Sequence, residues 1–224
     1  MAAGSAWDHR YRRAVRPPVT LEAFSEVAQQ ALEVDDPLAA VSTLLAWVED
    51  PHPDDEVSTR ELLSTAGTLR GAGGDVDGGV ALLHRAVATD GPAETDPRGA
   101  LYGLLLRAER QEEADRLAQE LRKERPTPAE ALGDVALSLW EHGRLEDAHR
   151  WYTLAASRVL RDTETDPAAA GIDALPGLLA DRAELRAELD LPADELDELG
   201  GQLDLDDHDD LGDLGDLGGL DTRT

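Results

Sequence analysis

The sequence predicts an all-α protein built from helical hairpins that repeat along the chain, and three observations support this fold class. First, a small residue recurs at nearly regular intervals, at Ala40, Gly79, Ala114 and Ala148. Each begins the apolar face of the second helix in a predicted hairpin. Second, helix caps and turn residues alternate at matching intervals. Third, aromatic residues make up only 4% of a chain that is 41% hydrophobic, so Ala and Leu must supply the packing. The later intervals approach the period of about 34 residues that is typical of helix–turn–helix repeats.

The N-terminal part of the chain is expected to be a flexible basic arm over residues 1–18, ending at Pro17-Pro18. Thr20 is suited to cap the first helix. The apolar residues that follow fall at helical spacing and form one face: Phe24, Val27, Ala28, Ala31 and Leu32. Asp36 and Pro37 then supply the N-cap and first position of a second helix.

A polar loop over residues 50–56 explains why the first interval is the longest. Ser58 and Glu61 have the spacing of a capping box, with Val57 and Leu62 as its hydrophobic staple. Glycines at positions 71, 73 and 74 should end this helix, and Asp75 should begin the next.

The same signals recur further along the chain. Asp96-Pro97 repeats the cap-plus-proline pair, residues 109–111 form a tight turn, and Thr127 to Glu130 is a second capping box with Pro128 at the first helical position. The next helix should stop at Gly143. Four helical repeats are therefore predicted over residues 19–162.

The C-terminal part changes character in two steps. Residues 163–200 are expected to form helices that cap the open end of the repeats, with Pro176 kinking or breaking this segment because an interior proline costs about 3 kcal/mol. Residues 190–224 contain thirteen acids and one base. The low-complexity end, residues 201–224, is predicted to be an acidic disordered tail.

The fourth unit resembles the tetratricopeptide repeat. Its small and large positions are Leu132, Ala136, Leu139, Gly143, Ala148, Tyr152 and Ala155. The segment LRAELDLPADELDEL also resembles the end of a group of actinobacterial tetratricopeptide proteins, some of which carry the Cys-rich SEC-C motif; this chain has no Cys and lacks that motif. The resemblance implies an α-helical solenoid that binds another protein, and it implies no reaction.

The charge and the composition of the chain exclude some classes of function. The net charge of −27 argues against nucleic acid as a partner, because a phosphate backbone requires a basic face. No apolar run is long enough to span a membrane and no secretory signal opens the chain, so a cytoplasmic location is expected. Scarcity of Lys, Ile, Phe and Asn suggests a GC-rich, actinobacterial genome; a halophilic source is the alternative.

No residue pattern predicts catalysis, a cofactor or a metal. The six histidines include no pair four residues apart and no His-Glu-x-x-His, and no serine lies in a nucleophile elbow. The glycines at positions 71, 73 and 74 follow a helix, so they are predicted to form a helix-ending turn and not a phosphate-binding loop. The run from Asp204 to His208 lacks the Gly and Glu that a calcium loop needs, since Asp209 and Gly215 occupy those positions.

The tetratricopeptide resemblance implies a concave groove lined by the first helix of each unit. The groove residues that it implies are Glu22, Gln29, Glu33, Glu61, Ser64, Thr68, Arg107, Glu130, Trp140 and Glu141. The Lys and Asn residues that clamp C-terminal carboxylates in the family are missing, since the matching positions hold Ser25, Gln29, Ser64, Thr68, Gly133 and Leu137. The acidic groove is expected to attract a basic segment, with Trp140 as its anchor. Trp47, Trp151 and Tyr152 are expected to fill gaps between helices.

The sequence thus favours a protein-interaction module, a scaffold or adaptor that binds a protein or peptide. The alternatives are a non-catalytic helical sensor of small molecules or an accessory subunit of an enzyme, and a charge-mask protein that acts through its acidic tail. The arm from Arg10 to Arg16 is itself a candidate ligand, in cis or on a neighbouring copy. The oligomeric state stays open.

Overall fold

The computed structural model describes residues 16–33, 37–125, 128–165 and 171–212, with side chains omitted at 32–33 and from 204 onward. Within these ranges every regular element is helical and no strand occurs, which confirms the all-α fold class. The chain divides into two compact units, residues 1–97 and 98–224, and each is described separately below.

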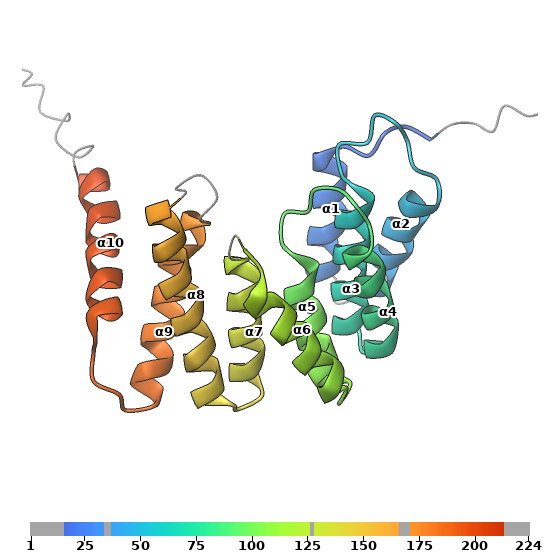
Figure 1. Ribbon diagram of the computed structural model, residues 1–224. Coiled ribbons are helices and arrows are strands. Elements are labelled where there is room, and N and C mark those ends of the chain that lie inside the picture. The colour runs from blue at the N-terminus through green and yellow to red at the C-terminus, as the bar shows by residue number, and fades with distance from the viewer. Residues whose placement is uncertain (1–15, 34–36, 126–127, 166–170, 213–224) are drawn as a thin grey trace, which may run out of the picture. The chain divides into compact units, whose positions relative to one another are not determined.

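The first unit contains four helices that pack in chain order (Figure 1). They are α1 (Leu21–Glu33), α2 (Pro37–Glu49), α3 (Thr59–Ala72) and α4 (Val76–Val87). Their shared core is aliphatic apart from Phe24, and Trp47 is partly buried against it as a gap-filling side chain. Helix α3 lies between α2 and α4, so most of its surface is buried.

Helices α3 and α4 approach closely because glycine occupies the contact on both sides. A Cβ added at Gly67 would lie 2.8 Å from Leu83 Cγ and 3.1 Å from the Gly79 carbonyl oxygen. Such distances are shorter than carbon contacts allow, so no larger residue fits without a shift. The close approach of Gly67 to the Gly79 backbone therefore brings the two helices together at the position where a small residue was predicted.

The second unit contains the remaining helices. They are α5 (Pro97–Arg107), whose first residue closes the preceding unit, α6 (Gln111–Lys123), α7 (Ala129–Glu141), α8 (Leu145–Thr165), a 3-10 turn (Ile172–Ala174), α9 (Leu175–Glu188) and α10 (Glu195–Gly212). From α6 onward each helix packs against the next, as the light-green-to-red part of Figure 1 shows. Ala148 and Ala155 of α8 are fully buried, as their small size predicts.

One turn geometry recurs in both units. In the α3–α4, α5–α6 and α7–α8 connections, the second residue after the helix has positive φ, at Gly74 (93°), Glu109 (58°) and Gly143 (70°). The residue that follows each of them donates its amide to a carbonyl in the last turn of the helix, on Arg70, Leu105 and Leu139 respectively. These three turns recur at nearly equal intervals along the chain, and the same geometry returns at a longer interval after α9, where Asp190 has a φ of 53° and Leu191 N donates to the Arg186 carbonyl.

Most of the predicted caps are confirmed. Thr20 Oγ1 accepts from Ala23 N at 3.1 Å, and Asp75 Oδ1 accepts from Gly78 N at 3.0 Å. Helices α2 and α5 begin at Pro37 and Pro97. Pro176 stands in the first turn of α9, directly after the 3-10 turn, so the break is also confirmed.

Two predictions about capping need correction. Ser58 Oγ accepts from Glu61 N as a capping box requires, but the Glu61 carboxylate accepts from Glu94 N and does not return to Ser58. The loop that follows α4 supplies the donor for Glu61 instead. Helix α7 begins at Ala129 after Pro128, one residue later than predicted, and Thr127 lies outside the described residues.

The boundaries of the two terminal segments also differ from the prediction. Arg16 was assigned to a flexible arm, yet it is held by Asp55, while residues 1–15 lie outside the described residues. The acidic tail was assigned to residues 201–224, but α10 continues to Gly212, and residues 213–224 are not described. Leu196, Leu199 and Leu203 recur at helical intervals, and α10 packs on α9, which explains why the helix passes residue 201.

Candidate functional site

A pocket of about 280 Å³ lies in the first unit, between the start of α1, the start of α3 and the loop that follows α4. Its floor is apolar, since Phe24 and Val57 are core residues and Leu21 stands at its edge with 60% of its surface exposed. The complete lining is Leu21, Phe24, Glu56, Val57, Ser58, Glu61, Pro92, Ala93 and Glu94.

Three carboxylates and no cation line this pocket. Glu56 Oε2 accepts from Leu21 N at 2.8 Å, in the position of an N-cap for α1, and Glu61 Oε2 accepts from Glu94 N at 2.7 Å. These bonds hold the Glu56 and Glu61 side chains at the pocket, where Glu56 and Glu94 are exposed and Glu61 is half-buried. The combination of an apolar floor and a negative rim suits an apolar side chain that is flanked by positive charge.

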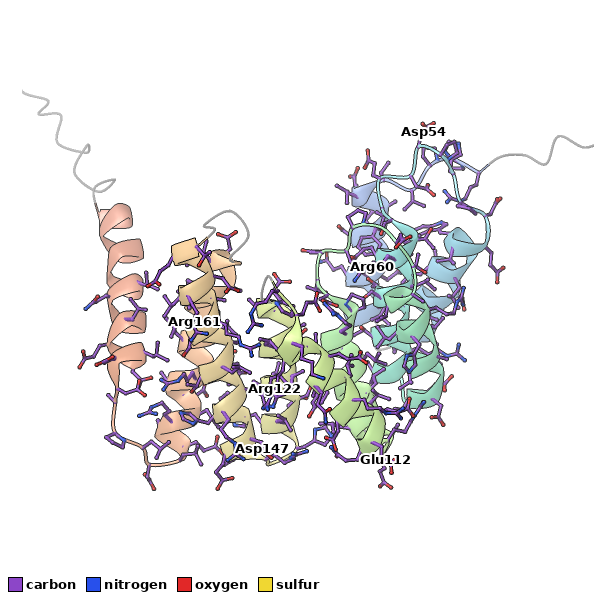
Figure 2. The ribbon with its side chains drawn as sticks, viewed as in Figure 1. Asp54, Arg60, Glu112, Arg122, Asp147 and Arg161 are labelled. Carbon is purple, nitrogen blue, oxygen red and sulfur yellow. The ribbon has the colours of Figure 1, made fainter. Side chains whose placement is uncertain are left out.

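The loop that closes one side of the pocket is held by α3. Besides the Glu61 bond, Ser58 Oγ donates to the Pro92 carbonyl, and Arg60 Nη2 lies 3.9 Å from Asp96 Oδ1. Arg60 is labelled on α3 in Figure 2. All of these contacts come from the first turn of α3 and its N-cap. They hold the loop after α4 in place as one wall of the pocket.

The chain enters this unit through a clamp beside the pocket. Arg16 donates from Nη1 and Nη2 to the two carboxylate oxygens of Asp55, at 2.8 and 2.5 Å, and from Nε to the Asp50 carbonyl at 2.6 Å. Asp55 also accepts from Val19 N at 2.7 Å and from His52 N at 2.8 Å. The Arg16 bonds hold the pKa of Asp55 far below its usual range. Figure 2 labels the neighbouring Asp54 on this loop.

Of the groove residues that the resemblance implies, six fall in the first unit, and only Glu61 lines the pocket. Glu22 and Gln29 are exposed on α1, and the side chain of Glu33 lies outside the described residues. Ser64 is only 6% exposed, so it is buried within the first unit and does not lie on an open surface there, contrary to the prediction. Thr68 is exposed and donates its hydroxyl to the Ser64 carbonyl at 3.1 Å.

The other four fall in the second unit. Arg107, Glu130 and Glu141 are exposed on α5 and α7. Trp140 is half-buried, packs edge-on against Tyr152 with ring centroids 6.5 Å apart, and donates from Nε1 to Glu188 Oε2 at 2.7 Å. Its indole N–H therefore already has an intramolecular acceptor on α9.

The structure also contains a charged cluster that the sequence reasoning missed. Arg182 is 1% exposed and Arg186 is 8% exposed, and both face carboxylates from the start of α10. Arg182 Nη1 and Nη2 lie 3.0 and 2.5 Å from Asp194, Nη1 lies 2.6 Å from Asp197, and Nε donates to Thr153 Oγ1 at 2.9 Å. The four-residue spacing of Arg182 and Arg186 was the available signal.

The second arginine of this cluster completes the link between three helices. Arg186 Nη1 lies 3.1 Å from Asp194 Oδ2 and 3.1 Å from His149 Nε2, and Nη2 donates to the Pro192 carbonyl. Its Nε is 2.9 Å from Asp197 Oδ2 without the alignment of a hydrogen bond. Burial, together with Arg182 and Arg186, lowers the pKa of His149. The Arg182 bonds lower the pKa of Asp194 to about 2. This cluster is a structural link, since its charges are paired with one another.

Positive charge gathers at a second place, on α6 and α8. Burial and the neighbouring Arg125, Arg122 and Arg161 lower the pKa of Arg158. Arg122 stacks over Trp151 at 4.3 Å, and its carbonyl accepts from Arg158 Nη1 at 2.7 Å. Figure 2 labels Arg122 and Arg161. Arg158 and Arg125 donate to carbonyls at the C-terminal end of α6, so these two cations are explained as capping groups.

The remaining predictions concern filling aromatics, metals and membranes. Trp151 and Tyr152 are buried, at 6% and 0% exposure, so their gap-filling role is confirmed. Across the side chains that are described, no group of three or more His, Asp or Glu is arranged to hold a metal ion. In the described part of the chain no helix has the length and apolar character needed to cross a bilayer.

Comparison with known proteins adds no further constraint: no family model, curated protein or solved structure matches this chain.

Proposed function

We propose that this protein is a non-catalytic protein-interaction module of the tetratricopeptide-like type, acting as a cytoplasmic scaffold or adaptor. The pocket of the first unit would receive an apolar side chain from a basic segment of the partner. The observation that carries the proposal is the meeting of an apolar floor, at Phe24 and Val57, with three carboxylates and no cation in the lining.

The repeated turn supports the module type. Three helical hairpins share the same hydrogen-bonded turn at nearly equal spacing along the chain, and a small buried residue lies on the second helix of each, at Gly79, Ala114 and Ala148. Such repeats bury a continuous core and leave their outer faces to bind other chains.

The exposed edge of the pocket favours a protein partner over the small-molecule alternative. Sites for small ligands and cofactors are concavities of about 300–1,000 Å³ that enclose most of the ligand. The pocket here stands at the lower end of that range, at about 280 Å³, and its edge residue Leu21 is 60% exposed, so it does not enclose a ligand on all sides. One aromatic or branched side chain fits such a space, while the rest of a peptide would lie across the carboxylates.

The test is binding of a fluorescein-labelled peptide, GRRWRRG, followed by fluorescence anisotropy. We expect replacement of its Trp by Ala to weaken binding at least tenfold, because burial of an aromatic side chain contributes about 1.5–3 kcal/mol. On the protein, Ala93→Leu should fill the pocket and weaken binding by about the same factor. Glu61→Gln keeps an acceptor for Glu94 N but removes a charge, so its roughly threefold effect should fade as salt rises.

A matched control separates the pocket from the general acidity of the chain. Glu26→Gln removes the same charge from an exposed position on α1 that belongs neither to the pocket lining nor to the predicted groove, and it should leave the dissociation constant unchanged. If GRRWRRG and GRRARRG bind equally well, or if Ala93→Leu has no effect, binding is nonspecific and the proposed site is wrong.

A further inference from the structure

We infer that the chain's own basic arm, residues 7–13, occupies the pocket of the first unit in cis, so that a partner segment must displace it. The inference rests on the proposed function and adds regulation to the same pocket. It is argued from the composition of the arm, from the point where the arm joins the described structure, and from the lining of the pocket.

The composition of the arm is complementary to the pocket. Residues 1–15 contain Arg10, Arg12 and Arg13 against one acid, Asp8, whereas the whole chain has a net charge of −27. Trp7 supplies an aromatic side chain, which is the kind of group that an apolar pocket of about 280 Å³ accepts. The arm therefore matches the ligand that the pocket is proposed to take.

The position of the arm follows from the Arg16 clamp. Asp55 holds Arg16 through both carboxylate oxygens, and the next residue, Glu56, lines the pocket. Leu21, five residues after Arg16, lines the pocket as well. The arm consequently joins the described structure beside the pocket, at a point fixed by a paired charge that is only 16% exposed.

The length of the arm is sufficient. An extended chain spans at most about 3.3–3.6 Å per residue, so the nine residue steps from Arg16 back to Trp7 cover about 30 Å. That reach allows Trp7 to return to a pocket whose wall adjoins Asp55. Because the tether is short, the arm's effective concentration at the pocket is about millimolar, so even a weak contact would compete with a partner.

The experiment compares the full chain with a full-length variant in which the arm is neutralised. The variant carries Trp7→Ser, Arg10→Gln, Arg12→Gln and Arg13→Gln, and it keeps Arg16 and all described residues. We expect GRRWRRG to bind this variant at least tenfold more tightly than it binds the unmodified chain. Adding Ala93→Leu to the variant should abolish that gain. Equal circular dichroism spectra would show that both chains are folded alike.

The outcomes separate the two proposals. Equal affinity of both chains for GRRWRRG, with Ala93→Leu still weakening binding, overturns the arm's role and leaves the pocket as a partner site. If the neutralised chain does not distinguish GRRWRRG from GRRARRG, the proposed function fails and the inference fails with it. If suppression by the arm disappears when the protein is diluted over about two orders of magnitude, the occupant is a second copy and the cis arrangement is refuted.

Discussion

Arg182 donates from its two terminal nitrogens to the two carboxylate oxygens of Asp194, at 3.0 and 2.5 Å, although Arg182 itself is 1% exposed. The pair joins α9 to the segment that begins α10, and the Nε bond to Thr153 extends the link to α8. A buried guanidinium contributes little net stability when it is fully paired, because its desolvation offsets the attraction. Removing one partner is costly, however, because charge is left buried and unpaired.

Arg182→Ala is therefore expected to lower the free energy of unfolding of the second unit by about 3 kcal/mol, through unpaired carboxylates and lost packing of the arginine stem. Urea unfolding followed by tryptophan fluorescence measures this change, in a Trp7→Phe and Trp47→Phe background where only Trp140 and Trp151 of the second unit report. The control is Arg150→Ala, since Arg150 pairs with Asp147 at the surface with 66% of its side chain exposed and should shift stability by less than about 1 kcal/mol. Equal effects of the two substitutions would show that the cluster is not a buried link.

His149 should make the second unit less stable in mild acid. Burial is the largest cause of its lowered pKa, and Arg182 and Arg186 outweigh the opposing Asp194 and Asp197. In the unfolded chain the imidazole has its ordinary pKa of about 6.5. Between that value and the lower folded value, the unfolded state binds more protons, so stability is fully present above about pH 6.5 and is lost as the pH falls.

The measurement is the urea midpoint of the second unit at about pH 7.5 and pH 5.5, in the unmodified chain and in His149→Gln. The glutamine can still accept from Arg186 but does not titrate, so its loss of stability over this range should be smaller. Asp194 does not contribute here, because its pKa of about 2 places its own loss of stability below about pH 4. Identical slopes in the two chains would contradict the role of His149.

The helices and their ends could be predicted from the sequence because each depends on neighbours in the chain. Thr20, Asp75 and Pro97 act within one turn of their own position, and small residues such as Ala148 reveal a helix contact through their spacing. The missed features depend on residues far apart. Asp55 pairs with Arg16, which lies 39 positions earlier in the chain. Glu61 accepts a hydrogen bond from a loop residue 33 positions later and does not complete its capping box.

The candidate site was only partly predictable for the same reason. Glu61 was expected at a binding surface and does line the pocket, but its apolar partners Val57 and Phe24 read as ordinary core residues. Ser64 was misplaced because the repeat alignment does not show how much of the α3 surface is buried by packing. The end of α10 was misplaced because the high density of acidic residues at 204–210 predicts disorder. The leucines at helical spacing before them outweigh this signal, because they let α10 pack on α9.

Ala148→Leu tests the close contact between α7 and α8. Ala148 is fully buried, so a leucine must displace neighbouring side chains or the helix itself, at a cost of about 1–3 kcal/mol. Ala187→Leu is the matched control, since Ala187 is exposed on α9 and the same added atoms would meet solvent there. A thermal or urea midpoint that falls for Ala148→Leu alone supports the packing. Equal midpoints for the two variants would mean that position 148 has room.

Glu109→Gly tests the repeated turn, because Glu109 has a φ of 58° where the equivalent positions hold Gly74 and Gly143. A left-handed conformation costs an L residue about 1–2 kcal/mol, whereas glycine adopts it freely and loses about 0.5–1 kcal/mol in unfolded-state entropy. The substitution is therefore expected to raise the free energy of unfolding by about 0.5–1 kcal/mol.

Two further variants, measured by their urea midpoints, test whether the stabilising effect of glycine is specific to the turn. Gly143→Ala should lower stability by about 1 kcal/mol, since it places a Cβ at a φ of 70°. Gln119→Gly, at an exposed position within α6, should also lower stability by about 1 kcal/mol, because glycine disfavours a helix interior. Only a turn that requires positive φ makes glycine stabilising at 109 and destabilising at 119. A loss of stability on Glu109→Gly would therefore reject the shared turn, and with it the geometric repeat on which the interaction-module proposal relies.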